Sequence, residues 1–120
     1  MIIWLPIMIY GTTTALGLVL GWYFLSSKRP PKAVQAIHLL TGFGGLEVVM
    51  LISSRSRGNA DLQENATIAL VLLAFAVVSG LFAGIMAKPR PDMLGPSLAL
   101  HALLGGSAFL VLLNWVINAA

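Results

Sequence analysis

Hydrophobic residues gather along the chain in four long runs, at positions 2–26, 33–53, 66–87 and 97–119. Polar and charged residues gather in the three stretches between these runs. Each run has roughly the 20 residues that an α-helix needs to cross ~30 Å of hydrocarbon. The pattern predicts an all-α membrane protein, an up-and-down bundle of four helices that spans a lipid bilayer.

The connections between the runs differ in charge. The first (27–32) and third (88–96) contain prolines, which cannot continue a helix, and they carry five of the seven Lys and Arg residues. The loop at 54–65 carries the other two, balanced by Asp61 and Glu64. Because Lys and Arg favour the cytoplasmic side, we expect the first and third connections there and both termini on the opposite side.

The two halves of the chain match at a constant offset of 63 positions, the difference between His38 and His101. The same offset relates several glycines: Gly42 to Gly105, Gly17 to Gly80 and Gly21 to Gly84. A constant offset indicates an internal repeat. We therefore expect one domain made of two tandem helical hairpins, at about 2–53 and 66–119, joined by the loop at 54–65.

His38 and His101 are the only histidines, and each falls in the early part of a predicted helix, the second and the fourth. Both helices start on the same side, so the two side chains belong to one leaflet. In an up-and-down bundle these helices lie at diagonal corners, roughly 11–14 Å apart. Two imidazoles, each about 2 Å from a shared metal, fit that separation. We predict that His38 and His101 ligate one haem b per chain.

The repeated glycines fit a flat macrocycle beside the histidines. Gly42 and Gly105 lie four residues after the ligands and share their helix face. On the first and third helices, the small residues that would let the ring edges approach the backbone are Gly17, Gly21, Gly80 and Gly84. Close helix packing is the alternative use of such glycines in membranes.

Basic residues at the predicted cytoplasmic surface are candidates for binding haem propionates, because paired cations suit carboxylates. The candidates are Arg29 in the first connection and Arg90 in the third. The basic residues are few and lie at membrane boundaries, so we expect no nucleic-acid partner.

The chain has no cysteine, which excludes thiolate-bound metals, iron–sulfur clusters and covalently attached c-type haem. Two alternatives remain for the histidines. Each could hydrogen-bond across helices without a cofactor, or each could bind the magnesium of a separate chlorophyll-type pigment.

The pattern His38-x-x-x-Gly42 and His101-x-x-x-Gly105 on four predicted helices resembles small bacterial b-type membrane cytochromes with the cytochrome b561-type architecture. The resemblance implies electron transfer through haem b, and we expect a bacterial inner or photosynthetic membrane. The sequence shows no nucleophile or substrate pocket, so we expect any activity of the chain to be redox passage through the cofactor. Many such cytochromes have four ligand histidines and two haems. With two histidines this chain holds at most one, so we expect a quinone or other membrane redox subunits as partners.

Glu47 is the other notable polar residue within a predicted span. It lies nine residues after His38, on the opposite helix face and ~13 Å further along the helix. Glu47 supports an alternative function as a small transporter, similar in outline to the small multidrug-resistance family, although that family places its key glutamate in the first helix. A structural scaffold subunit without a cofactor is the remaining alternative.

Overall fold

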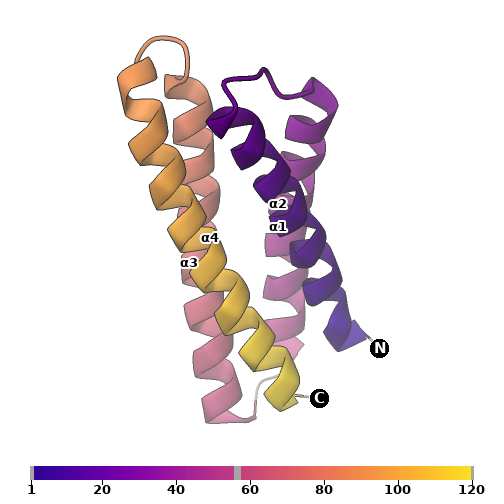
Figure 1. The fold of residues 1–120 in the computed structure, drawn as a ribbon. Coiled ribbons are helices and arrows are strands. Elements are labelled where there is room, and N and C mark those ends of the chain that lie inside the picture. The colour runs from indigo at the N-terminus through magenta and orange to yellow at the C-terminus, as the bar shows by residue number, and fades with distance from the viewer. Residues whose placement is uncertain (1, 56–57, 120) are drawn as a thin grey trace.

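The computed structural model describes residues 2–55 and 58–119. In these residues a short 3-10 helix, η1 (Ile2–Trp4), leads into α1 (Leu5–Leu25), followed by α2 (Lys32–Arg55), α3 (Ala60–Met86) and α4 (Pro91–Ala119) (Figure 1). The predicted all-α four-helix bundle is confirmed. All four α-helices are long and apolar enough to cross a membrane, and the longest dimension of the molecule is 47 Å.

The helix ends follow from local sequence. The chain leaves α1 through Ser27, whose φ of 54° reverses the backbone while the Lys28 N–H donates to the Tyr23 carbonyl at 2.9 Å. At the start of α3, the side chain of Asn59 accepts from the backbone N–H groups of Asp61 and Leu62. α4 begins at Pro91, the position where a missing N–H costs least.

Two predicted connections are shorter than expected. The loop placed at 54–65 is wrong in extent, because α2 continues to Arg55 and α3 already begins at Ala60. The connection placed at 88–96 is likewise too long, since α4 begins at Pro91 and includes Pro96. In both cases a polar first turn precedes the apolar run, so the run marks the part suited to hydrocarbon rather than the whole helix.

The helices pack as two antiparallel hairpins, α1 with α2 and α3 with α4. α1 also contacts α4, and α3 contacts α2, which places α2 and α4 at diagonal corners. The turns at 26–31 and 87–90 lie at one end of the bundle, and both termini lie at the other (Figure 1). We call these the turn end and the termini end. α2 and α4 therefore run in the same direction, as predicted.

The buried core lies toward the termini end. It unites all four helices around fully buried side chains such as Val49, Leu112 and Trp115; its other members are Tyr10, Ile52, Ala66, Ala69, Leu73, Ala108 and Val116. Positions 14–44, all of them described, contain no buried residue. Buried residues are thus concentrated at the termini end, and nearer the turn end, where the histidines lie, the second hairpin alone adds buried Ala83 and Ser97 among the described residues.

Replacing Leu112 by alanine should destabilise the bundle by about 2–5 kcal/mol, the usual cost of such a truncation in a core. Leu112 is fully buried, whereas Leu110 two positions earlier is 66% exposed and provides the matched control. Equilibrium unfolding in detergent, followed by circular dichroism, measures both variants. Equal losses for L112A and L110A would contradict the described core.

Candidate functional site

His38 of α2 and His101 of α4 come together inside the bundle. Their ring centroids are 5.9 Å apart and the ring planes are nearly perpendicular, at 83°. The two residues lie six and ten positions from the starts of their helices, about 9 and 15 Å along them. The prediction that diagonal helices place the two histidines opposite one another agrees with this geometry.

Each imidazole is anchored by its Nδ1 atom to a backbone carbonyl of the other helix in its own hairpin. His38 Nδ1 lies 2.9 Å from the Thr13 oxygen, and His101 Nδ1 lies 2.7 Å from the Ala76 oxygen. A carbonyl oxygen only accepts, so each Nδ1 carries the proton and donates. The lone pair is then on Nε2, and no described residue hydrogen-bonds either Nε2 atom. The site presents two unshared ring nitrogens.

Two glycines allow the rings to reach these carbonyls. A Cβ atom at Gly17 would lie 3.1 Å from Cε1 of His38, and one at Gly80 would lie 2.8 Å from Cε1 of His101. Both distances are shorter than normal carbon–carbon contact, about 3.5–4.0 Å. Each glycine is one helical turn after the carbonyl in question, so the imidazole crosses the helix at a place without a side chain in its path.

The contacts of the two histidines recur at the offset seen in the sequence. Donor and acceptor are 25 positions apart in both hairpins. Adding 63 to Thr13 and Gly17 gives Ala76 and Gly80, the residues that meet His101. The internal repeat therefore appears in the structure as one repeated contact between a carbonyl, a glycine and a histidine.

The other predicted glycines do not make close helix contacts. A Cβ at Gly21, Gly84 or Gly105 would meet nothing within 4 Å, and one at Gly42 would meet only the Thr13 side chain, at 3.9 Å. Gly84 is exposed on the bundle surface, whereas the other three are partly buried. These positions leave room beside the helices instead of bringing two backbones together.

The two predicted propionate-binding arginines differ in their surroundings. Arg90 donates from Nε and from one terminal nitrogen to the Asp92 carboxylate, at 3.2 and 3.1 Å, and this hydrogen bonding raises the pKa of Arg90. Arg29 is exposed and makes no ion pair with any described residue. Arg29 is therefore available to an anionic group at the turn end, while Arg90 is already paired.

Glu47 lies on the outer surface of α2. Its side chain is exposed and forms no hydrogen bond or ion pair with the described part of the chain. As predicted from helix geometry, it does not join the histidines. An exposed carboxyl group in the apolar part of a helix is costly in lipid, which makes it a candidate contact for another membrane subunit.

An apolar groove of about 440 Å³ runs between α3 and α4 beside His101. Phe75, Ser79 and Phe82 line it from α3, and residues of α4 such as Leu100 complete it. The Ser79 hydroxyl is also 3.4 Å from His101 Nδ1, so it lies between the groove and the histidine.

The first hairpin lacks this lining. At the offset of 63, the positions equivalent to the three α3 residues of the groove are Thr12, Leu16 and Val19. None of these is aromatic, and an aliphatic side chain stands where α3 has the serine hydroxyl. This aromatic and hydroxyl lining is therefore a feature of the second hairpin.

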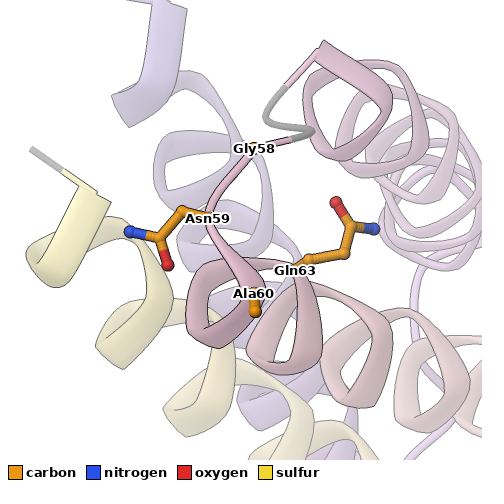
Figure 2. A pocket seen from close by; sticks show the side chains of 4 residues that line it. All are labelled: Gly58, Asn59, Ala60 and Gln63. Atoms are coloured by element: carbon orange, nitrogen blue, oxygen red, sulfur yellow. The ribbon is translucent and has the colours of Figure 1, made fainter.

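A second hollow, of about 520 Å³, lies at the start of α3, at the termini end. Figure 2 shows its lining residues, Gly58, Asn59, Ala60 and Gln63, with the two amide side chains pointing to different sides. None of these is a histidine or a carboxylate, and the Asn59 side chain caps α3. This hollow lies away from the histidine pair.

Sequence reasoning missed the groups that hold the histidines. The acceptors are backbone carbonyls of Thr13 and Ala76. Every residue type has such a carbonyl, so the sequence does not show which one accepts. Ser79 was missed because it has no counterpart in the repeat, where Leu16 stands. Tyr10 was also missed, although its hydroxyl donates to the Gly42 carbonyl at 3.1 Å and joins α1 to α2. A buried phenolic hydroxyl usually has a hydrogen-bond partner, but the sequence does not show that this partner is a backbone carbonyl of α2.

Comparisons with protein families, with curated proteins and with solved structures find no match for this chain.

Replacing Gly80 by alanine should displace the His101 ring and cost about 1–3 kcal/mol, the usual penalty for overpacking. The added Cβ would stand 2.8 Å from the ring, whereas an alanine at Gly84 would meet nothing and serves as the control. The proton NMR signal of His101 Nδ1–H reports the carbonyl bond, and thermal unfolding reports stability. If G84A perturbs the ring as much as G80A, the close contact at Gly80 is not what holds it.

Proposed function

We propose that this chain is a haem b-binding integral membrane electron-transfer protein, with His38 and His101 as the two ligands of one iron. The single observation that carries the proposal is the close pair of imidazoles, each anchored through Nδ1 with the Nε2 lone pair free to bind a metal. Metal-ligating histidines commonly donate their other N–H to a backbone carbonyl, which fixes the tautomer and the ring orientation.

The spacing of the rings supports a shared metal. Two metal–nitrogen bonds of about 2 Å, and roughly 1 Å from each nitrogen to its ring centre, give a centroid separation of ~6 Å. The observed separation is 5.9 Å. Perpendicular planes are compatible with this arrangement, because both planes can contain the line through the metal and the two nitrogens. Two separate pigments, one for each histidine, would require the Nε2 atoms to point apart at this short distance.

The donor set also favours a macrocycle. Among the described residues, no group of three or more His, Cys, Asp and Glu side chains gathers to hold a metal. Structural zinc takes four protein ligands, whereas haem iron brings four nitrogens and needs only axial ligands from the chain. Two imidazoles from opposite sides meet that need.

Space for a flat cofactor is consistent with the packing. The half of the bundle that contains the histidines has few buried side chains, and alanine-sized groups at Gly21 and Gly105 would touch nothing. Arg29, unpaired at the turn end, is the better placed of the two predicted arginines for a propionate. Arg90 would first have to leave Asp92.

The cofactor would supply reversible one-electron chemistry. The chain's own residues do the rest. The Thr13 and Ala76 carbonyls orient the imidazoles and increase their basicity, and the apolar surroundings limit access of water. No residue is required to act as a nucleophile, so we propose an electron-transfer subunit rather than an enzyme.

The position of the histidines defines what the partners must do. Both lie toward the turn end, so the electron needs a second carrier to cross the remaining thickness of the bilayer. The groove beside His101 is apolar, opens to lipid and contains the Ser79 hydroxyl, which suits a quinone. The exposed Glu47 supports contact with another membrane redox subunit.

We place the complex in a bacterial inner or photosynthetic membrane, with the turn end cytoplasmic and both termini on the other side.

The purified chain, expressed with haem available, should show a low-spin b-type spectrum with about one haem per chain. Replacing either His38 or His101 by alanine should abolish the low-spin signal, because one axial ligand is lost. A reduced-minus-oxidised visible spectrum with haem quantification measures this.

Glu47→Gln provides the matched control, since Glu47 lies in the same helix as His38 but on the outer surface. Its spectrum should equal that of the wild type. A colourless wild-type protein, or unchanged spectra in both histidine variants, would overturn the proposal in favour of a transporter or a scaffold subunit.

A further inference from the structure

The two histidines have different surroundings at Nδ1 although the repeat makes their anchors equivalent. The Ala76 carbonyl accepts from His101 Nδ1 at 2.7 Å and also from the Ser79 hydroxyl at 2.9 Å. The Thr13 carbonyl accepts from His38 Nδ1 at 2.9 Å, and the position equivalent to Ser79 in that hairpin is Leu16, which has no hydroxyl. The second anchor is thus shared with a hydroxyl, and the first is not.

From this difference we propose that Ser79 is a positioning residue. By bonding the Ala76 carbonyl, it makes the His101 imidazole a weaker ligand for the metal. The inference rests on the proposed haem ligation. A carbonyl that accepts a second hydrogen bond is a poorer acceptor for the first. The Nδ1–H bond of His101 is then less polarised, and the imidazole is a less basic ligand. A less basic axial ligand stabilises oxidised iron less, so Ser79 raises the reduction potential.

A second contact acts in the opposite direction. The Ser79 oxygen lies 3.4 Å from His101 Nδ1 and could share its proton. That distance is near the outer limit of a hydrogen bond, whereas 2.9 Å to the carbonyl is close to ideal. Donation from Ser79 to Ala76 is therefore the dominant effect.

The short 2.7 Å anchor of His101 has a separate origin in the tighter second hairpin. A Cβ at Gly80 would lie 3.0 Å from Nδ1 of its histidine, against 3.7 Å at Gly17. The ring is closer to α3 than its counterpart is to α1. The short distance to the Ala76 carbonyl would by itself strongly polarise the Nδ1–H bond of His101, and Ser79 reduces that polarisation.

The second hairpin supplies the first pair of variants for a test. Ser79→Ala removes the hydroxyl and leaves His101 Nδ1–H as the side-chain donor to the Ala76 carbonyl, beside the backbone bond of α3. We expect the haem midpoint potential of S79A to shift to a more negative value. Ser79→Thr keeps a hydroxyl that can bond the carbonyl three or four residues earlier, and should stay near the wild type.

The first hairpin supplies the reciprocal pair. Leu16→Ser adds a hydroxyl at the position equivalent to Ser79, and it also removes a partly buried apolar side chain. Leu16→Ala removes the same side chain without adding a hydroxyl, so it is the matched control. We expect the midpoint potential of L16S to be more positive than that of L16A, and equal potentials in the two variants would contradict the proposed effect of the hydroxyl.

Proton NMR of the haem-free protein gives an independent readout. The His101 Nδ1–H signal of S79A should move downfield as its bond to Ala76 strengthens, while the His38 signal stays in place. Unchanged or positive-going potentials in S79A, with haem bound at the wild-type level, would overturn the role of Ser79 and leave the haem proposal intact. A wild-type chain that binds no haem would overturn the proposed function itself, whatever the NMR signals show.

Discussion

The structure depends on one interaction used twice, the hydrogen bond from an imidazole Nδ1–H to a backbone carbonyl of the neighbouring helix. In a helix the carbonyl already serves the backbone, and in a membrane no water is available to satisfy a polar ring. His38 and His101 can enter the apolar part of the bundle because the Thr13 and Ala76 carbonyls accept hydrogen bonds from their Nδ1–H groups. Once Nδ1 is fixed in this way, the free Nε2 atoms become the chemically available ends of the rings.

That interaction explains the glycines and the distribution of packing. The ring can reach a carbonyl of the neighbouring helix only where no side chain stands in the way, which requires Gly17 and Gly80. Large apolar side chains could not fill the same space without displacing the rings. The core is accordingly concentrated at the termini end, around Leu112 and Trp115. The termini end holds the four helices together through the buried core, and the other half of the bundle contains the close pair of imidazoles.

Much of the fold could be predicted from the sequence, because the length of an apolar run is enough to indicate a spanning helix. Four apolar runs of spanning length can only form four helices in a membrane, and short connections make neighbours antiparallel. The helix ends were less predictable. Asn59 and Pro91 start helices within stretches that read as loops, since capping and polar first turns obey local hydrogen bonding rather than hydropathy. The pairing of His38 and His101 could be predicted, because the repeat relates two side chains. The backbone groups of the site could not. The anchoring carbonyls could not be inferred, because any residue type supplies the same acceptor.

A duplicated hairpin would be expected to hold its two histidines in the same way, and the differences between the halves therefore carry information. Equivalent anchors are present at Thr13 and Ala76, since losing either would leave an unsatisfied ring nitrogen inside the apolar bundle. The surroundings of the second anchor differ, with Ser79 in place of Leu16 and the two phenylalanines of the groove in place of Thr12 and Val19. These differences lie together on one face of α3, beside His101. The first hairpin thus has the plain form of the anchor. The second combines the anchor with an apolar groove between α3 and α4, the feature on which the proposed quinone contact rests.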